Sequence, residues 1–356
     1  MLTLALIFGG RSAEHEISLA SARFVADMLD RERYEIVPVG ITRDGRWLRP
    51  RDLDAALTGG LDSAAGEDVH LVMDPARPGL QFTASGFQPL DFVFPIMHGT
   101  FAEDGTVQGL LELAGLPYAG GGVAANAVGM DKELMKDVFA AHGLAQVAYL
   151  VLRDAAATGP AAVAAVEERL PYPVFVKPVN LGSSVGMTKA HDRAELGPGL
   201  ALAAAYDRKV IVEQAAEGRE LECALLGNED ARASVTGEVI PVNEFYDYES
   251  KYTEGMMSFV IPADIGAAKQ AEVAELAVAA YKAIDCSGFA RCDFFLESGS
   301  GRVLLNEINT IPGMTPMSGF PRLWAATGVD NRTLVEEIVQ LGLRRHAVRS
   351  RLRTTR

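Results

Sequence analysis

The first hundred residues alternate strand-like and helix-like patterns, and this alternation limits the possible folds more than any other feature. Leu2–Phe8 is an apolar run of buried-strand length that ends at Gly9-Gly10, and a helical pattern covers residues 12–29. Further strand patterns follow at 34–41 and 91–96. Strands that alternate with helices favour a parallel sheet with helices on its faces. The N-terminal region is therefore expected to be a parallel-sheet α/β domain.

Two loops at the ends of these strands carry candidate binding residues, because ligands bind such sheets outside the carboxyl ends of the strands. In the first loop, Ser12 could cap the following helix, with acidic residues in its first turn, while Glu14 could instead hold a substrate ammonium group. His98 and Glu103 in the second loop allow the same structural and functional interpretations. The residues alone leave both open.

Two further α/β regions follow, and the second of them shows its first strand near residue 210. Helical patterns cover 131–142, 267–284 and 331–343, and a strand pattern covers 173–177. We predict three α/β domains of unequal size. Their expected bounds are 1–120 for the N-terminal domain, 121–213 for the central domain, 214–345 for the C-terminal domain, and 346–356 for a basic tail.

Composition narrows the function classes. The formal net charge of −14 argues against a nucleic-acid binder. No apolar run reaches the length of a spanning helix and Leu2–Phe8 lacks a basic flank, so we expect a cytoplasmic protein without membrane contact. The three cysteines lack metal-binding spacing and are expected to be buried thiols. The six arginines of residues 344–356 are expected to form a solvated tail, with a dedicated anion site as the alternative.

A predicted hairpin at residues 289–309 places polar side chains together. Strand patterns at 289–296 and 302–309 flank a five-residue turn, which sets Leu296 opposite Arg302. Alternate side chains of the two strands then share a face, and a slip of one residue would scatter the set. The predicted polar face holds Arg291, Asp293, Glu307 and Asn309, and the apolar face holds Phe294, Leu304 and Ile308.

The polar face of this hairpin is suited to a divalent cation. Two carboxylates and an amide are hard oxygen donors of the kind that bind Mg²⁺, and Arg291 could neutralise oxygens of a reacting group. The alternative is a surface ladder of salt bridges. The Pro312-Gly313 turn that follows could offer a backbone N–H to a developing oxyanion.

A small-residue loop at 182–186 follows the strand that carries Lys177, and it is typical of phosphate binding. Its glycine and serine residues allow close backbone approach, and Lys177 supplies a point charge. A simple turn is the alternative. Lys132 at a helix start needs an anionic partner or solvent. The polar and aromatic segment 244–252 suggests a lid loop.

Seven motifs in sequence order carry a more specific signal together than any of them carries alone. They are Gly9-Gly10-x-Ser12-x-Glu14-His15-Glu16-x-Ser18, His98-Gly99-Thr100 with Glu103-Asp104-Gly105, Met130-Asp131-Lys132, Lys177-Pro178 with Gly182-Ser183-Ser184-Val185-Gly186-Met187, Phe245-Tyr246-Asp247-Tyr248 with Lys251-Tyr252, Arg291-x-Asp293, and Asn306-Glu307-x-Asn309-Thr310-x-Pro312-Gly313-Met314-Thr315. In these residues the chain resembles the D-alanine–D-alanine ligase family of the ATP-grasp superfamily, over about residues 1–343.

The resemblance implies an ATP-grasp fold with ATP between the central and C-terminal domains, two Mg²⁺ ions (Mn²⁺ as a possible substitute), and a homodimer. It implies ligation of two D-alanines through a D-alanyl phosphate, for peptidoglycan precursor synthesis. The implied ATP-binding residues are Lys132, Lys177, Ser184, Glu213, Gln214, Ala216, Glu220 and Lys251. The implied metal ligands are Asp293, Glu307 and Asn309.

The same resemblance implies the remaining roles. Glu14 would hold the ammonium group of the first D-alanine near His98, and Ser183 would link Glu14 to Tyr252 in the closed lid. Arg291 and the backbone of Gly313 would form the oxyanion hole, and Ser318 with the Gly319 N–H would take the carboxylate of the second D-alanine.

Two alternatives within this resemblance are a D-Ala–D-Lac or D-Ser ligase and an inactive nucleotide-binding paralogue. The run Tyr246–Tyr252 favours alanine as second substrate, and the presence of Arg291, Asp293 and Glu307 argues against inactivity. Gly319 departs from the family pattern, since a larger apolar residue is common there.

Overall fold

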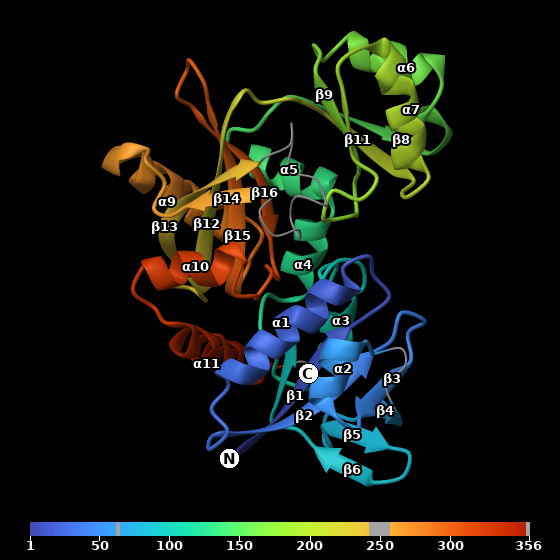
Figure 1. The fold of residues 1–356 in the computed structure, drawn as a ribbon, viewed down its shortest axis with the longest axis vertical. Coiled ribbons are helices and arrows are strands. Elements are labelled where there is room, and N and C mark those ends of the chain that lie inside the picture. The colour runs from blue at the N-terminus through green and yellow to red at the C-terminus, as the bar shows by residue number, and fades with distance from the viewer. Residues whose placement is uncertain (62–64, 242–256, 354–356) are drawn as a thin grey trace.

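The computed structural model describes residues 1–61, 65–241 and 257–353, which form three sheets with their covering helices. Figure 1 shows the N-terminal sheet at one end of the molecule and the smallest sheet at the other, with the third sheet at middle height on the left, beside α4 and α5. Within the described part of the chain, no helix is both long and apolar enough to cross a membrane.

The three strands predicted in the N-terminal region pair in parallel, as expected, and antiparallel strands that were not predicted make the whole sheet mixed. Only β1 pairs in parallel, with β2 on one side and β7 on the other; the other pairs are antiparallel. Antiparallel strands extend the sheet beyond β2. Helix α2 (Leu53–Gly59) lies in the connection between β3 and β4, while loops without a helix join the other antiparallel pairs. The sheet order is β6-β5-β4-β3-β2-β1-β7. The strands are β1 (Leu2–Gly9), β2 (Tyr34–Ile41), β3 (Trp47–Pro50), β4 (Gly66–Val72), β5 (Gly79–Phe82), β6 (Gly86–Pro89) and β7 (Phe92–Pro95).

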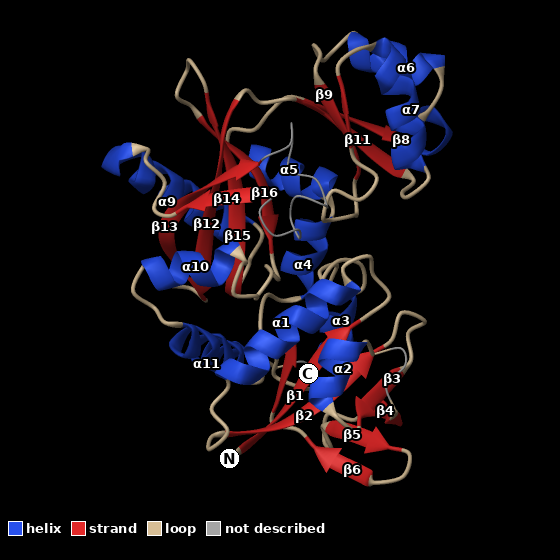
Figure 2. Ribbon diagram, viewed as in Figure 1, coloured by secondary structure: helices blue, strands red, loops and turns tan. Residues whose placement is uncertain are grey.

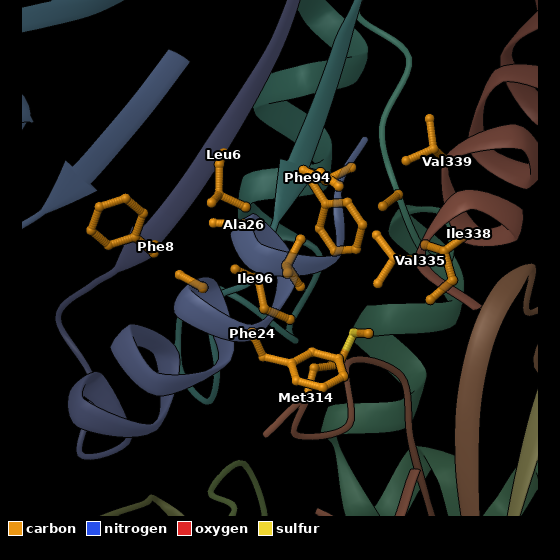
Figure 3. Packing of buried hydrophobic residues seen from close by; sticks show 14 of the residues in the cluster. Leu6, Phe8, Phe24, Ala26, Phe94, Ile96, Met314, Val335, Ile338 and Val339 are labelled. Carbon is orange, nitrogen blue, oxygen red and sulfur yellow. The ribbon is translucent and has the colours of Figure 1, made fainter. Parts of the chain in front are cut away.

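Strand β1 is buried on both faces because helices cover both. Leu4, Leu6 and Phe8 pack in one core with α1 and α11, while Ala5 and Ile7 pack in another with α3. Figure 3 shows Phe94 of the sheet beside Val335 of α11, with Leu6 on the other side of Phe94. The helices of this region are α1 (His15–Met28), α2 (Leu53–Gly59) and α3 (Thr106–Leu113).

Helix α1 begins at His15 with Glu14 as its N-cap residue, so Ser12 is not the cap. The Ser12 hydroxyl instead donates to the carbonyl of His98 (2.7 Å) and accepts from the Glu14 N–H (2.9 Å). Ser12 thus ties the first loop to the second, and this places Glu14 beside the His98 loop.

The second sheet is antiparallel, in the order β10-β9-β11-β8. It contains β11, so the strand near Val210 belongs to this sheet and not to the third one. The elements are β8 (Tyr149–Arg153), the 3₁₀ helix η1 (Asp154–Ala157), α6 (Pro160–Glu167), β9 (Val174–Pro178), β10 (Thr188–Ala190), α7 (Arg193–Ala204) and β11 (Lys209–Gln214). Helices α6 and α7 cover one face, as Figure 2 shows.

The third sheet is antiparallel, in the order β14-β13-β12-β15-β16. Helices α4, α5 and α9 pack in its core with Cys223 and Cys292; all three cysteines are buried thiols, as predicted. The strands are β12 (Gly218–Gly227), β13 (Arg232–Pro241), β14 (Met257–Val260), β15 (Gly288–Glu297) and β16 (Val303–Asn309). The helices are α4 (Val123–Met130), α5 (Lys132–Ala141), α9 (Gly266–Ala283), α10 (Gly319–Ala326) and α11 (Asn331–Arg349).

Helix α11 returns from the third sheet to the N-terminal sheet, and it extends further than predicted. Arg345 stacks on the Tyr118 ring, with its guanidinium carbon 4.1 Å from the ring centre, and lies 3.5 Å from Glu112. Arg349 pairs with the same carboxylate at 2.7 Å. The expected solvated tail is therefore wrong for Arg345, whereas Arg349 belongs to the same helix but stays half exposed.

Candidate active site

Two adjoining cavities lie where the three sheets meet. The larger, of about 350 Å³, lies between the second and third sheets, and the smaller, of about 150 Å³, lies between the third sheet and the N-terminal loops. Six residues line both cavities, which makes them two compartments of one site, and only the smaller cavity is also lined by residues of the N-terminal loops. The shared lining residues are Lys132, Gly182, Ser183, Glu222, Val239 and Glu307.

The polar face of the β15–β16 hairpin forms as predicted, but in a different register. Leu296 lies opposite Val303 and not opposite Arg302, a slip of one residue. An irregularity then inserts Asn306 as an extra residue, so Asp293 pairs with Glu307 and Arg291 with Asn309. The slip of one residue would turn the side chains of β16 to the opposite face, and the extra residue of the bulge turns those beyond it back again. The four polar residues share a face.

The bulge also corrects one member of the apolar face. Leu305, and not Leu304, pairs with Phe294. Leu305, Phe294 and Ile308 all pack in the core under the third sheet. A sequence pattern of strict alternation cannot reveal a bulge, because the extra residue is set by the partner strand.

Arg291 holds Asp293 in a two-pronged ion pair. Its Nε and Nη2 atoms each donate to a different carboxylate oxygen at 2.6 Å. Across the hairpin, Glu307 lies 3.9 Å from the ammonium of Lys132, and Asn309 accepts a hydrogen bond from the Ile311 N–H at 3.1 Å. Two carboxylates and an amide oxygen thus converge near a lysine. Among residues 1–61, 65–241 and 257–353, no three histidine, cysteine or acidic side chains gather as a metal cluster.

A buried chain of charges runs beneath the larger cavity. Glu213 accepts from Lys177 at 2.5 Å and pairs with Lys136 at 2.9 Å. Burial alone would raise the pKa of Glu213, but the two ammonium groups outweigh burial and hold that pKa below its usual range. Burial lowers the pKa of Lys177, but the negative charge of Glu213 opposes this effect, and the pKa is raised overall. Lys177 therefore stays charged at the cavity wall.

The small-residue loop connects the larger cavity to the N-terminal domain. Ser183 and Ser184 adopt left-handed backbone conformations, with φ of 49° and 59°. The Ser183 hydroxyl donates to Glu14 Oε1, and Lys132 Nζ donates to the carbonyl of Leu181 at 2.7 Å. The loop is thus held between a carboxylate of the first domain and a lysine of α5.

Glu14, His98 and Glu103 lie together at the first-domain end of the smaller cavity. The Gly99 N–H donates to Glu103 at 2.6 Å, and burial, followed by the charge of Glu14, raises the pKa of Glu103 well above its usual range. Gly99 has φ of 74°, and a side chain there would lie 2.6 Å from Glu14. The loop that contains Glu14 and the loop that contains His98 and Glu103 therefore lie next to each other, as expected.

His98 also reaches the loop after β16. Its Nδ1 lies 3.0 Å from the carbonyl of Ile311, which can only accept, so Nδ1 carries a proton. Its Nε2 lies 3.0 Å from the Ser21 hydroxyl, which accepts from the Met314 N–H at 3.1 Å. Burial lowers the pKa of His98 against the opposing effect of Glu14. These contacts fix the turn that contains Gly313.

The turn at Gly313 and the start of α10 line the opposite end of the smaller cavity. The Ser318 hydroxyl contacts Thr315 Oγ1 at 2.8 Å and accepts from the Thr315 N–H at 3.1 Å. Ser318 is also the N-cap residue of α10, which starts at Gly319. Free N–H groups at a helix start favour an anion.

The remaining predicted residues divide between the larger cavity and the undescribed segment. Gln214, Ala216 and Glu220 line the larger cavity. Lys251 and Tyr252, with the whole predicted lid 244–252, lie outside the described residues.

Sequence reasoning missed several buried charges, and Lys136 and Glu222 are the two that contact predicted site residues. Lys136 lies on the buried stripe of α5, with Met135 and Phe139, and this spacing could have revealed it. Glu222 lies in β12 between the apolar residues Leu221 and Cys223. A carboxylate is costly to bury without a partner, so an acidic residue inside an apolar strand could have indicated a functional position.

Comparisons with known proteins point to one family. The model for the D-ala D-ala ligase N-terminus matches residues 3–121, and that for the D-ala D-ala ligase C-terminus matches residues 138–340. The chain is 46% identical to the D-alanine–D-alanine ligase of Heliobacterium modesticaldum, over 99% of this chain and 98% of the relative. It is 42% identical to that of Bacillus pumilus, over 99% of both.

Solved structures show the same likeness. The VanG D-Ala:D-Ser ligase of Enterococcus faecalis superposes with a TM-score of 0.87 at 34% identity, over 96% of this chain and 99% of the other. The D-alanine–D-alanine ligase of Coxiella burnetii superposes with a TM-score of 0.86 at 34% identity, over 98% and 96%.

Proposed function

The chain belongs to the D-alanine–D-alanine ligase family, and from this premise we propose that it joins two D-alanines into D-alanyl-D-alanine, with ATP as co-substrate. The observation that carries the proposal is the pair of adjoining cavities. Lys132, Ser183 and Glu307 line both of them, so a phosphate chain in the larger can meet a carboxylate in the smaller. The product is a precursor for peptidoglycan synthesis.

We propose that ATP binds in the larger cavity. Lys132 and Lys177 would bind its phosphates, with the backbone and hydroxyl groups of Ser184 beside them. The Glu213 carboxylate is paired with Lys136 and Lys177, so we propose that it positions Lys177. Gln214, Ala216 and Glu220, which line the same cavity, would contact the adenosine.

The donor set on the β15–β16 hairpin fits Mg²⁺. Asp293 and Glu307 are cross-strand partners, and Asn309 adds an amide oxygen on the same face. These hard oxygen donors are few, which suits Mg²⁺ because its remaining positions are filled by phosphate oxygens and water. When bound there, Mg²⁺ would neutralise charge on the transferring phosphoryl group.

In the first step, Glu14 would bind the ammonium group of one D-alanine, with Ser183 fixing the carboxylate of Glu14 by its hydrogen bond. A carboxylate oxygen of that D-alanine attacks the γ-phosphorus, the bond to the bridging oxygen breaks, and ADP leaves. The product is D-alanyl phosphate, which water would hydrolyse, so the site must exclude solvent.

In the second step, the amine of the other D-alanine attacks the acyl carbon, and phosphate leaves after an oxyanion has formed. Arg291 and the backbone N–H of Gly313 would stabilise that oxyanion. Both line the smaller cavity. The second carboxylate would bind at Ser318 and the Gly319 N–H, where α10 begins.

A competition assay tests the choice of second substrate, since the VanG D-Ala:D-Ser ligase has nearly the same fold. The protein is given Mg·ATP and equimolar D-alanine with D-serine or D-lactate, and the products are identified by mass. D-Alanyl-D-alanine as the main product supports the proposal. A predominance of the mixed product would reassign the chain to D-Ser or D-Lac ligation.

We propose further that the protein acts in the cytoplasm as a homodimer, as its family resemblance implies. Light scattering on the purified protein checks the second point, with a dimer mass expected and a monomer mass contradicting it.

A further inference from the structure

Glu222 is an acidic residue of the site to which the proposed mechanism gives no role. Its side chain is 7% exposed and lines both cavities. On β12 it is the cross-strand partner of Asp293 on β15, and its Oε1 atom lies 3.5 Å from Arg291 Nε. The carboxylate therefore lies next to the residue proposed to stabilise the oxyanion.

Gly319, the first residue of α10, leaves the space that this carboxylate fills. A methyl group at Gly319 would overlap Glu222 Oε2, so the two positions share one volume. Gly319 is also the position at which the family resemblance leads us to expect a larger apolar side chain. In this chain, that volume holds a negative charge beside the proposed binding site for the second carboxylate.

The charges of the smaller cavity allow one role for Glu222. Two zwitterionic amino acids must bind there, and each ammonium group needs a negative partner in a site with little water. Glu14, Glu103, Glu222 and Glu307 are the acidic residues among the described lining residues. Glu14 is proposed for the first ammonium and Glu307 for Mg²⁺, while Glu103 lies beside Glu14 at the first-substrate end.

We propose that Glu222 binds the ammonium group of the second D-alanine before that group reacts. The second carboxylate at Ser318 and the ammonium at Glu222 would then orient the amino acid from both ends. This inference rests on the proposed function, and it assigns the second substrate a specificity residue.

The test separates an ammonium ion from a neutral nucleophile. Hydroxylamine is largely uncharged at neutral pH, lacks a carboxylate, and captures an acyl phosphate as a hydroxamate. In Glu222→Gln, we expect kcat/KM for the second D-alanine to fall about 10- to 100-fold. D-Alanyl hydroxamate formation should stay within about threefold of normal, because hydroxylamine brings no ammonium group for Glu222 to bind and Asp293 still holds Arg291 at 2.6 Å.

Two further variants sharpen the result. Glu220→Gln, two residues away and lining the larger cavity only, should raise the KM for ATP and leave the ratio of dipeptide to hydroxamate unchanged. Gly319→Ala keeps Glu222 but displaces its carboxylate, so it should raise the KM for the second D-alanine while hydroxamate formation continues. It serves in place of Glu222→Gln if that variant fails to fold.

Three outcomes would overturn the inference. Equal losses of dipeptide and hydroxamate would show that Glu222 acts through Arg291 or the metal site. A dipeptide rate within twofold of normal with unchanged KM would show that Glu222 is not needed. A raised requirement for Mg²⁺ would make it a metal ligand. The unmodified protein is measured first, and absence of D-alanine-dependent phosphate release there would contradict the proposed function itself.

Discussion

Asp293 on β15 lies directly opposite Glu307 on β16, so two carboxylates share one face beside the cavities. The arrangement depends on the bulge at Asn306, and it is the site proposed above for Mg²⁺. Glu307→Gln should therefore reduce turnover below about a tenth of normal at saturating Mg²⁺, since it removes a charged oxygen donor. Steady-state phosphate release measures this. Glu297→Gln at the turn of the same hairpin is the control, and normal activity of Glu307→Gln would contradict the metal assignment.

The hydrogen bond from Ser183 to Glu14 predicts that removing the Ser183 hydroxyl weakens binding of the first D-alanine only. Ser183→Ala removes the donor that fixes the Glu14 carboxylate, so the KM for the first D-alanine should rise about 5- to 20-fold. Ser184→Ala has a similar backbone conformation, with positive φ, but should mainly raise the KM for ATP. Initial rates over both substrates separate the two. Equal effects of the two variants on both KM values would argue against distinct roles.

The buried chain Lys136–Glu213–Lys177 predicts a pH-dependent stability. Glu213→Gln leaves two buried ammonium groups without their carboxylate, and unfolding should become easier by about 3–5 kcal/mol at pH 7. The pKa of Glu213 is lowered in the folded state, so its contribution is complete above the pKa of the unfolded carboxyl, about 4.3. It declines as the pH falls below that value.

Urea unfolding of Glu213→Gln and the unmodified protein at pH 7 and at pH 3.5 measures this. The difference should shrink at the lower pH. Adding Lys136→Met should recover part of the loss, because one uncompensated charge is removed. A difference that is the same at both pH values would contradict the electrostatic explanation.

Much of the fold and site could be predicted from the sequence, because it rests on local patterns. Strand β2 begins and ends where the apolar pattern does, and Arg291, Asp293 and Glu307 share the predicted face. The hairpin register could not be predicted, since the bulge at Asn306 is set by cross-strand packing. The antiparallel strands β3–β6 are short and lack a strong alternation, so their turns were not recognised.

The buried charges are the other part that the sequence did not yield. Lys136 and Glu222 each take their role from partners far away in sequence, Glu213 and Arg291, and no local pattern links them. The same holds for Arg345, whose partner Glu112 lies on a helix of the first domain.

Arg345 and Arg349 provide a matched pair for the role of α11. The Arg345 side chain is 11% exposed and stacks on Tyr118, whereas that of Arg349 is 53% exposed. Arg345→Ala should lower the free energy of unfolding by about 1–2 kcal/mol through the lost cation–π contact and packing. Arg349→Ala should change it by less than about 0.5 kcal/mol. Denaturant unfolding decides, and equal effects would mean that the stacking on Tyr118 contributes nothing.

The measurement that tests the central claim most directly is the yield of product against ATP consumed. Phosphate and D-alanyl-D-alanine are quantified together from Mg·ATP with D-alanine or L-alanine as the sole amino acid. We predict that D-alanine gives phosphate and dipeptide in equal amounts, because each dipeptide forms from one acyl phosphate, and that L-alanine gives neither. Phosphate without dipeptide, or no amino-acid-dependent phosphate from a folded protein that binds ATP, would contradict the account.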